Sequence, residues 1–296
     1  MTIDFWMLAF IFSKLRKPQI SLYFKIFDEL KEGRRSPQFQ EQLSLLGRQK
    51  IIEIQDSLLQ SVESGYELIY PGHDFYPDQF LRLEEIPYLL RMQGSPIWLI
   101  KPGLAVVGSR EPSNLSLQWM TQELAIFFER QNCFSVSGGA RGVDQKAHAL
   151  SLLQETPTVA LLPSGMKALY PSYFGDWIQP IIKQGGAVIS EYEDNQKMLK
   201  HHFLQRNRLI SALGQATLII EAGLKSGTLL TARQSLEQSR PVWVVPGHPI
   251  DSRFQGSVNL ICDGATPFRD AQDLGVLFDS EIHEFSLIQS SSSTAR

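Results

Sequence analysis

The hydrophobic pattern of the chain changes near residue 100. Beyond that point, short continuous apolar runs alternate with longer amphipathic stretches. Continuous apolar strands are typical of a parallel sheet that helices cover on both faces. The sequence therefore predicts a doubly wound, mostly parallel, Rossmann-like α/β domain over residues 101–275. Its strands are expected at Leu104–Gly108, Phe134–Ser137, Thr158–Leu162, Ala187–Ser190, Ala216–Glu221 and Val242–Val245, with helices near 116–131, 143–154, 173–184, 203–213 and 228–239.

The remaining segments have different patterns. Residues 1–65 contain no alternating strand and predict a small helical module. Its apolar run Phe5–Phe12 is too short to span a bilayer and lacks a cleavage site, so we expect a buried helix rather than an export signal. Residues 66–100 are rich in proline and predict an extended connector that packs on the core. The acidic, serine-rich stretch 276–296 predicts partial disorder.

Composition and charge exclude several classes of protein. Hydrophobic residues make up 43% of the 296 positions, which is enough for a sizeable core. The formal net charge of -3 gives no global positive field, so a nucleic-acid site must be a local patch. Residues 14–50 carry an excess of Lys and Arg that fits solvated helix faces as well as a DNA-contacting face. Two cysteines without a C-x-x-C pair indicate a reducing, cytoplasmic setting.

Glycines and cations recur in the loops expected after the strands. In an open α/β sheet these loops share one edge with helix N-termini, which offer unpaired N–H groups to anions. Gly108-Ser109-Arg110 follows the first strand, and Ser137–Asp144 follows the second with three glycines and an arginine. Phe203–Ile210 and Glu221–Thr228 add further cations. Together these loops predict an elongated anion-binding crevice that suits a phosphate chain more than a single nucleotide.

Familiar catalytic and cofactor motifs are missing from the sequence. The Ser137–Asp144 loop resembles a dinucleotide fingerprint, but no acid follows the next strand to hold a ribose, so NAD binding is disfavoured. No Walker A motif, nucleophile elbow or metal-binding histidine spacing occurs. His148 is expected to be a packed residue, and Asp144 and Glu221 to serve in capping or salt bridges more often than as an acid–base pair. We expect no catalytic residues, no metal and no cofactor.

Seven short motifs occur in order across the 141 residues from 107 to 247. Together they resemble the DNA-processing protein A (DprA/Smf) family. The motifs are V-G-S-R (Val107–Arg110), S-G-G-A-R-G-V-D-x-x-A-H (Ser137–His148), L-Y-P (Leu169–Pro171), S-E-Y (Ser190–Tyr192), R-N-R-L-I (Arg206–Ile210), S-G-T-L-L-T-A (Ser226–Ala232) and V-P-G (Val245–Gly247).

The resemblance implies a non-enzymatic protein that binds incoming single-stranded DNA during natural transformation and loads the RecA recombinase onto it. It also implies a homodimer formed through the Rossmann-like domain, a SAM-like helical module before it, and no membrane partner. Many members carry a C-terminal winged helix, and we expect none here because the stretch after Phe268 is too short. The residues expected at the DNA site are Gly108, Ser109, Arg110, Ser137, Gly138, Gly139, Arg141, Gly142, Phe203, Arg206, Asn207, Arg208, Lys225, Ser226, Gly227 and Thr228.

The sequence leaves two alternative functions open. The first is a nucleoside-monophosphate phosphoribohydrolase-like enzyme on a similar fold, whose signature P-G-G-x-G-T-x-x-E supplies a catalytic glutamate. Here Thr231 occupies the glutamate position, and a threonine cannot stabilise a developing oxocarbenium ion as a carboxylate does. The second alternative is a nucleotide sensor that uses one or two of the loops and binds mononucleotides tightly.

Overall fold

The computed structural model describes the backbone of residues 2–16 and 18–293, and the side chains as far as Ile282. The described residues form one sheet of nine strands in the order β1-β2-β6-β5-β4-β3-β7-β8-β9. β1 (Glu67–Ile69) and β2 (Leu90–Gly94) are antiparallel, and β2 also runs antiparallel to β6. All other neighbours in this order are parallel. The parallel strands are β3 (Gly103–Gly108), β4 (Phe134–Ser137), β5 (Thr158–Leu162), β6 (Ala187–Ser190), β7 (Ala216–Ile220), β8 (Val242–Val244) and β9 (Thr266–Pro267).

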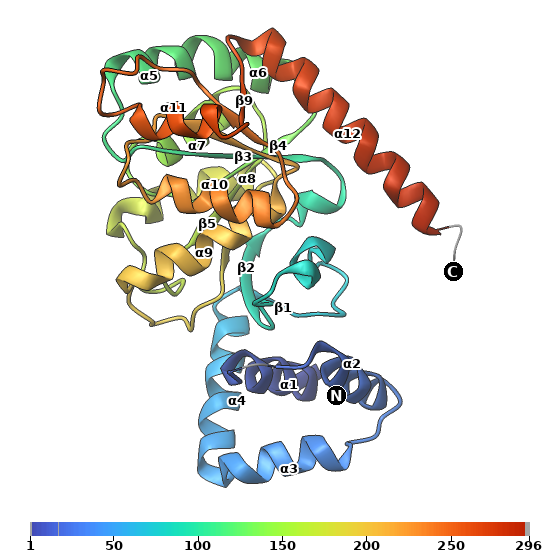
Figure 1. Cartoon of the computed structure of the whole chain (residues 1–296). Helices are drawn as coiled ribbons and strands as arrows, with labels where there is room; N and C mark the ends of the chain where they lie inside the picture. The colour runs from blue at the N-terminus through green and yellow to red at the C-terminus, as the bar shows by residue number, and fades with distance from the viewer. Residues whose placement is uncertain (1, 17, 294–296) are drawn as a thin grey trace.

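Helices cover both faces of the sheet (Figure 1). On one face lie α9 (Lys200–Leu213) and α10 (Thr228–Glu237), together with the 3₁₀ turn η1 (Asp78–Arg82). On the other face lie α5 (Asn114–Trp119), the π-helical turn η3 (Met120–Leu124), α6 (Ala125–Arg130), α7 (Val143–Leu153), α8 (Gly175–Lys183) and α12 (Ala271–Ser293). Smaller elements are η2 (Ile97–Leu99), η4 (Ser172–Phe174) and α11 (Gln255–Cys262).

The strands are apolar on both sides because both sides are covered. In β3, Leu104 and Val106 face the α6–α7 layer, whereas Ala105 and Val107 face the α9 layer, and all four are buried. Successive side chains of a strand point to opposite faces, so a strand packed on both faces loses its polar alternation. This explains the continuous apolar runs of the sequence, and the α/β class predicted from them is confirmed.

The order of the strands fixes where a ligand can bind. From β3 the chain builds outward through β4, β5 and β6, then returns to the other side of β3 with β7, β8 and β9. β3 and β7 therefore flank the point where the winding direction reverses. At such a switch point the loops leave the sheet in opposite directions and open a crevice at the carboxyl ends of the strands.

The N-terminal helices form a group of their own, which is drawn in blue in Figure 1. They are α1 (Thr2–Lys14), α2 (Ile20–Lys31), α3 (Pro37–Leu46) and α4 (Arg48–Glu63). The apolar run at the start of the chain lies in α1, where Met7, Leu8 and Phe12 are buried. None of the described helices is long and apolar enough to cross a membrane.

A hydrogen bond to a buried ion pair joins this helical group to the sheet. Arg91 of β2 lies 2.8 Å from Asp194, which follows β6, and Ser61 of α4 donates a hydrogen bond of 3.0 Å to the same carboxylate. Lys14 of α1 pairs with Glu193 at 2.7 Å, and both of these side chains are exposed. Because an exposed ion pair contributes little to stability, the buried hydrogen bond from Ser61 is the stronger of the two polar contacts.

Several helices and strands were not predicted from the sequence. The segment 66–100 supplies β1 and β2 as well as two 3₁₀ turns, because short antiparallel strands between prolines leave almost no periodic signal. The helices α11 and α12 were also missed. The structure gives residues 271–293 as helix, whereas we expected partial disorder from residue 276 onward. Residues 294–296 of that expected tail lie outside the described residues.

His148 is a packed residue, as expected. It is fully buried in α7, its Nδ1 lies 2.7 Å from the hydroxyl of Thr158 in β5, and its Nε2 has no partner among the described residues. Burial lowers the pKa of His148 to about 3, and the positive charge of Arg206 acts in the same direction.

This burial predicts a loss of stability in mild acid. The unfolded chain takes up a proton on His148 near pH 6.5, whereas the folded protein does so only near pH 3, so stability falls as the pH drops below 6.5. Between pH 7 and pH 5 the loss from this one group is about 2 kcal/mol. Urea denaturation of the wild type and of His148→Gln at both pH values measures it. Equal losses in the two proteins would contradict the assignment.

Candidate nucleic-acid interface

A pocket of about 790 Å³ opens at the carboxyl ends of the strands, beside the switch point between β3 and β7. It is bounded by the end of β3, the loop after β4, the start of α9 and the turn that precedes α10. Its lining contains four cations and one carboxylate. They are Arg110, Lys200, Arg206, Lys225 and Asp144. The excess of positive charge favours an anionic ligand.

Arg206 is the buried cation of the pocket. Only 3% of the residue is exposed, and its Nη1 donates a hydrogen bond of 2.8 Å to the carbonyl of Leu161 at the end of β5. Its Nε finds no acceptor among the described residues. Burial lowers the pKa of Arg206 to about 10, although the negative charge of Asp144 opposes the shift, so the guanidinium remains charged at neutral pH. A buried cation with unused donors is stabilised by an anionic ligand.

Three side chains build an aromatic and cationic wall above Arg206. The guanidinium of Arg110 lies 4.5 Å from the centre of the Phe203 ring, and that of Arg206 lies 5.9 Å from the same ring. Tyr170 meets Phe203 edge to face with 5.6 Å between ring centres. Phe203 thus presents a partly exposed ring close to two cations, and this combination of an aromatic side chain with guanidinium groups suits the bases and phosphates of a single strand.

The loop after β4 supports this wall from below. Asp144 accepts hydrogen bonds from the backbone N–H groups of Gly138 (3.2 Å) and Ala140 (3.3 Å), so it closes the loop instead of capping α7. Burial raises the pKa of Asp144, against the lowering effect of Arg206. A Cβ atom at Gly138 would overlap the guanidinium of Arg206. Gly142, with φ +88°, lets the carbonyl groups of Ser109 and Arg110 approach where a Cβ would stand.

A second wall is formed by the turn before α10. Ser226, Gly227 and Thr228 line the pocket, and the hydroxyl of Ser226 accepts a hydrogen bond of 3.2 Å from the N–H of Thr228. Lys225 is exposed at the rim. The N-terminus of α10 therefore lies beside the same space as the arginines, which adds the positive end of a helix dipole.

The pocket brings together nine of the sixteen residues expected from the sequence. They are Gly108, Arg110, Phe203, Arg206, Asn207, Lys225, Ser226, Gly227 and Thr228. Ser109, Gly138, Gly139 and Gly142 lie behind this lining: Ser109 holds the loop through backbone hydrogen bonds to Ile220 and Val143, and Gly139 packs on Phe174. Ser137 is buried and donates to the carbonyl of Val106. Arg141 is exposed outside the lining, 3.9 Å from Glu111.

Arg208 points away from the pocket. Its Nη2 contacts both carboxylate oxygens of Glu191 at 2.8 and 2.9 Å, and its Nε donates to the carbonyl of Glu85 at 3.0 Å. Burial alone would lower the pKa of Arg208, but the charge and hydrogen bonds of Glu191 outweigh it and leave the pKa raised. The structure therefore gives Arg208 a role in joining α9 to the connector rather than in the pocket.

Two of the lining residues that were absent from the sequence-based set bear on ligand binding, namely Lys200 and Tyr170. Lys200 stands three residues before Phe203 and shares its helix face, but the helix was expected to begin at 203. Tyr170 belongs to the L-Y-P motif, and nothing in its local sequence showed that its ring would reach Phe203 from a loop after β5.

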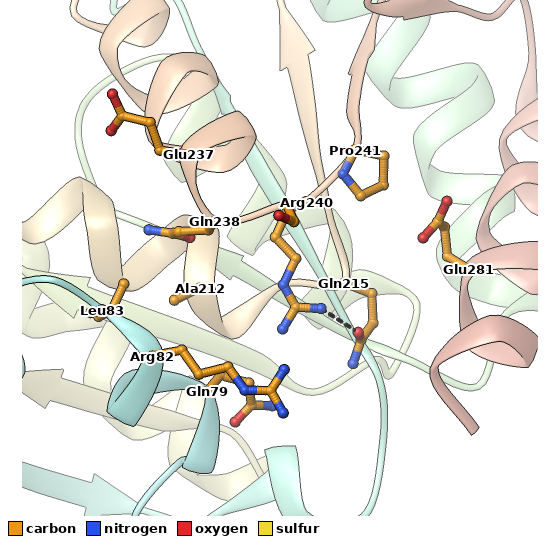
Figure 2. Close-up of a pocket in the computed structure, with 11 residues that line it drawn as sticks. Gln79, Arg82, Leu83, Ala212, Gln215, Glu237, Gln238, Arg240, Pro241 and Glu281 are labelled. Carbon is orange, nitrogen blue, oxygen red and sulfur yellow. Dashed lines mark hydrogen bonds between the residues drawn. The ribbon is translucent and has the colours of Figure 1, made fainter. Parts of the chain in front are cut away.

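A second pocket, of about 440 Å³, lies at the opposite, amino ends of the strands (Figure 2). Arg82 and Arg240 line it, and Arg240 donates a hydrogen bond of 2.8 Å to Gln215. Two glutamates, Glu237 and Glu281, share the lining and balance the charge. None of the sixteen expected residues lines this pocket. Among the described residues, three or more metal-ligating side chains converge neither here nor elsewhere.

Comparison with known proteins shows the family of this chain. The family described as DNA recombination-mediator protein A matches residues 67–279, which include both walls of the pocket. The chain belongs to the DNA recombination-mediator protein A family. It is 33% identical to Protein Smf of Escherichia coli over 224 residues, which cover 75% of this chain and 59% of that protein. It is 32% identical to DNA processing protein DprA of Streptococcus pneumoniae over 213 residues, covering 70% of this chain and 72% of that one.

Solved structures of family members share the fold. DNA processing protein A of Streptococcus pneumoniae superposes with a TM-score of 0.75 at 26% identity, covering 93% of this chain and 98% of that one. The Helicobacter pylori protein, whose structure was solved to describe its single-stranded DNA binding mode, gives a TM-score of 0.64 at 31% identity. That match covers 73% of this chain and 96% of the other.

The position of Arg208 predicts separable effects on stability and binding. Arg208→Met leaves the Glu191 carboxylate without its partner, which lowers the free energy of unfolding by about 3 kcal/mol. Because Arg208 does not line the pocket, the folded variant should bind a single-stranded oligonucleotide within about twofold of the wild type. Urea denaturation and fluorescence anisotropy measure the two quantities. A large loss of binding at unchanged stability would return Arg208 to the DNA site.

Proposed function

We propose that this chain binds single-stranded DNA along the carboxyl edge of its sheet and processes DNA during natural transformation and recombination. The observation that carries the proposal is the Phe203 ring, which lies within 6 Å of the guanidinium groups of both Arg110 and Arg206. It offers a stacking surface and phosphate contacts together, which is the combination that single strands require. The Helicobacter pylori relative, known for its single-stranded DNA binding mode, supports the same ligand class.

The wider role follows from membership of the family. We propose a cytoplasmic homodimer, formed through the Rossmann-like domain of residues 101–275, that protects incoming single strands and loads the RecA recombinase onto them. The helical segment 1–65 and the connector 66–100 would then be separate modules attached to that domain. The chain spans 59% of the length of Protein Smf, so these activities of a whole relative are proposals for this chain.

We favour binding over catalysis on the chemistry of the pocket. Asp144 is the one carboxylate among the described lining residues, and it already accepts two backbone hydrogen bonds. Thr231, at the position where a phosphoribohydrolase would carry its glutamate, is buried and has no carboxylate to offer. A carboxylate fixed inside its own loop is poorly placed to stabilise an oxocarbenium ion or to activate water.

The proposal predicts affinity that grows with strand length. Titration of labelled single strands of increasing length should show tighter binding for longer strands, weaker competition by duplexes and mononucleotides, and a steep loss with salt. Arg110→Ala should weaken binding about tenfold and lower the salt slope by about one. Fluorescence anisotropy over a salt series measures both. Tight mononucleotide binding without length dependence would favour a sensor or a hydrolase, which product analysis with nucleoside monophosphates separates.

Matched arginine variants sharpen this test. Arg233 is exposed on α10, pairs with Glu237 and lies outside the pocket lining, so Arg233→Ala controls for the loss of one positive charge. Arg141→Ala reports whether the strand extends beyond the pocket toward the loop after β4. A salt slope that drops equally in Arg110→Ala and Arg233→Ala would mean that only general charge, and not the pocket, attracts DNA.

A further inference from the structure

Glu221 is a buried, strained residue that the pocket itself does not use. It follows β7 directly, is 0% exposed and has a φ of +61°, in the left-handed region that residues other than glycine rarely adopt. Such a backbone persists only where the surroundings hold it in place, and strained residues of this kind gather at functional sites. Its side chain does not line the pocket.

The carboxylate of Glu221 holds the start of α5. Its Oε2 accepts a hydrogen bond of 2.9 Å from the backbone N–H of Ser113 and one of 2.7 Å from the hydroxyl of Ser116. Ser113 is the N-cap of α5, and its hydroxyl accepts a hydrogen bond of 3.2 Å from the N–H of Ser116. The other oxygen, Oε1, has no partner among the described residues. One carboxylate oxygen of the residue after β7 thus holds the N-cap of α5 in place.

This contact bears directly on Arg110, because the loop that carries Arg110 is short and fixed at both ends. At its beginning, the N–H of Ser109 donates to the carbonyl of Ile220 at 3.4 Å, and the carbonyl of Ser109 accepts from the N–H of Val143 at 3.1 Å. At its end, Ser113 is held by Glu221. Without Glu221 the Ser113 end of the loop loses its hydrogen bond to the residue after β7, so the Arg110 guanidinium would lose its fixed position over Phe203.

We propose that Glu221 is a positioning residue for DNA binding, which acts by holding the Ser113 end of the loop so that Arg110 stays over the Phe203 ring. The inference rests on the proposed binding of single-stranded DNA. It assigns a negative side chain a favourable role in binding a polyanion, which direct electrostatics would not do. Removing a negative charge near the pocket should strengthen DNA binding by long-range attraction, whereas losing the position of Arg110 should weaken it.

A double-mutant cycle with Arg110 tests the inference. The probe is a fluorescein-labelled oligothymidylate of roughly 20 nucleotides. Glu221→Ala should weaken binding about tenfold and lower the salt slope toward that of Arg110→Ala. In the Arg110→Ala background the same change should cost less than about twofold, because the side chain that Glu221 positions is then absent. Glu221→Gln keeps an oxygen acceptor for Ser113 and Ser116 and should stay within about threefold of the wild type.

Two further variants separate positioning from general destabilisation. Thr217 lies in β7, the strand that Glu221 follows, and its hydroxyl shares a buried hydrogen bond with Ser235 of α10. Thr217→Val removes this bond at a distance from the Arg110 loop, so it should lower stability without changing DNA affinity or the salt slope. Ser116→Ala removes one of the two donors to Glu221. It should weaken DNA binding by about threefold, again only when Arg110 is present. If Glu221→Ala does not fold, Ser116→Ala takes its place in the double-mutant cycle.

The outcomes distinguish this inference from the proposed function. Additive effects of Glu221→Ala, or of Ser116→Ala in its place, with Arg110→Ala would overturn the positioning role while leaving DNA binding intact. Loss of affinity in Thr217→Val equal to that in Glu221→Ala would also overturn it. If the wild type fails to bind the oligothymidylate, the proposed function falls and the positioning role falls with it.

Discussion

The charge of Arg206 is the constraint on which the carboxyl edge of this protein depends. A guanidinium that is almost completely buried must be offset by nearby acceptors and negative charge. The protein provides the carbonyl of Leu161 and the neighbouring carboxylate of Asp144. Asp144 in turn gathers the N–H groups of the loop after β4. The loop, its glycine at position 138 and the floor of the pocket therefore form one interdependent unit around a single cation.

Within that unit, the hydrogen-bond donors of Arg206 are only partly used. A fully paired buried arginine, such as Arg208 with its bidentate Glu191 and two backbone carbonyls, has little left to offer a ligand. Arg206 has one protein acceptor and an Nε without a partner among the described residues. The two arginines belong to one motif and are both buried, yet their hydrogen-bond inventories differ. An unused hydrogen-bond donor beside a partly exposed aromatic ring is what distinguishes a ligand site from a structural ion pair.

Helix geometry explains how far the sequence could predict this site. Residues three or four apart on a helix share a face, so Phe203, Arg206 and Asn207 face the pocket together. Residues two apart point in different directions, which favours different surroundings for Arg206 and Arg208. Helix spacing thus gave a reason to question Arg208 in the R-N-R motif, and placing the helix start at Lys200 would have added that lysine. The loop residue Tyr170 follows no such periodicity, and its contact with Phe203 depends on the tertiary fold.

The same distinction holds for the fold as a whole. The six strands from β3 to β8 could be read from the sequence because burial on both faces makes them continuously apolar. β1 and β2 are short strands added to the edge of the sheet by antiparallel pairing, in which β2 takes its register from β6 and β1 takes its register from β2. Contacts that matter for function are as hard to predict from the sequence as these edge strands, because they too depend on tertiary pairing. The carboxylate of Glu221 meets Ser113 across 108 positions of sequence, and only the pairing of β3 with β7 brings them together. The contacts that the sequence does not predict therefore lie mainly where separate loops meet at the sheet edge, which is also where the pocket lies.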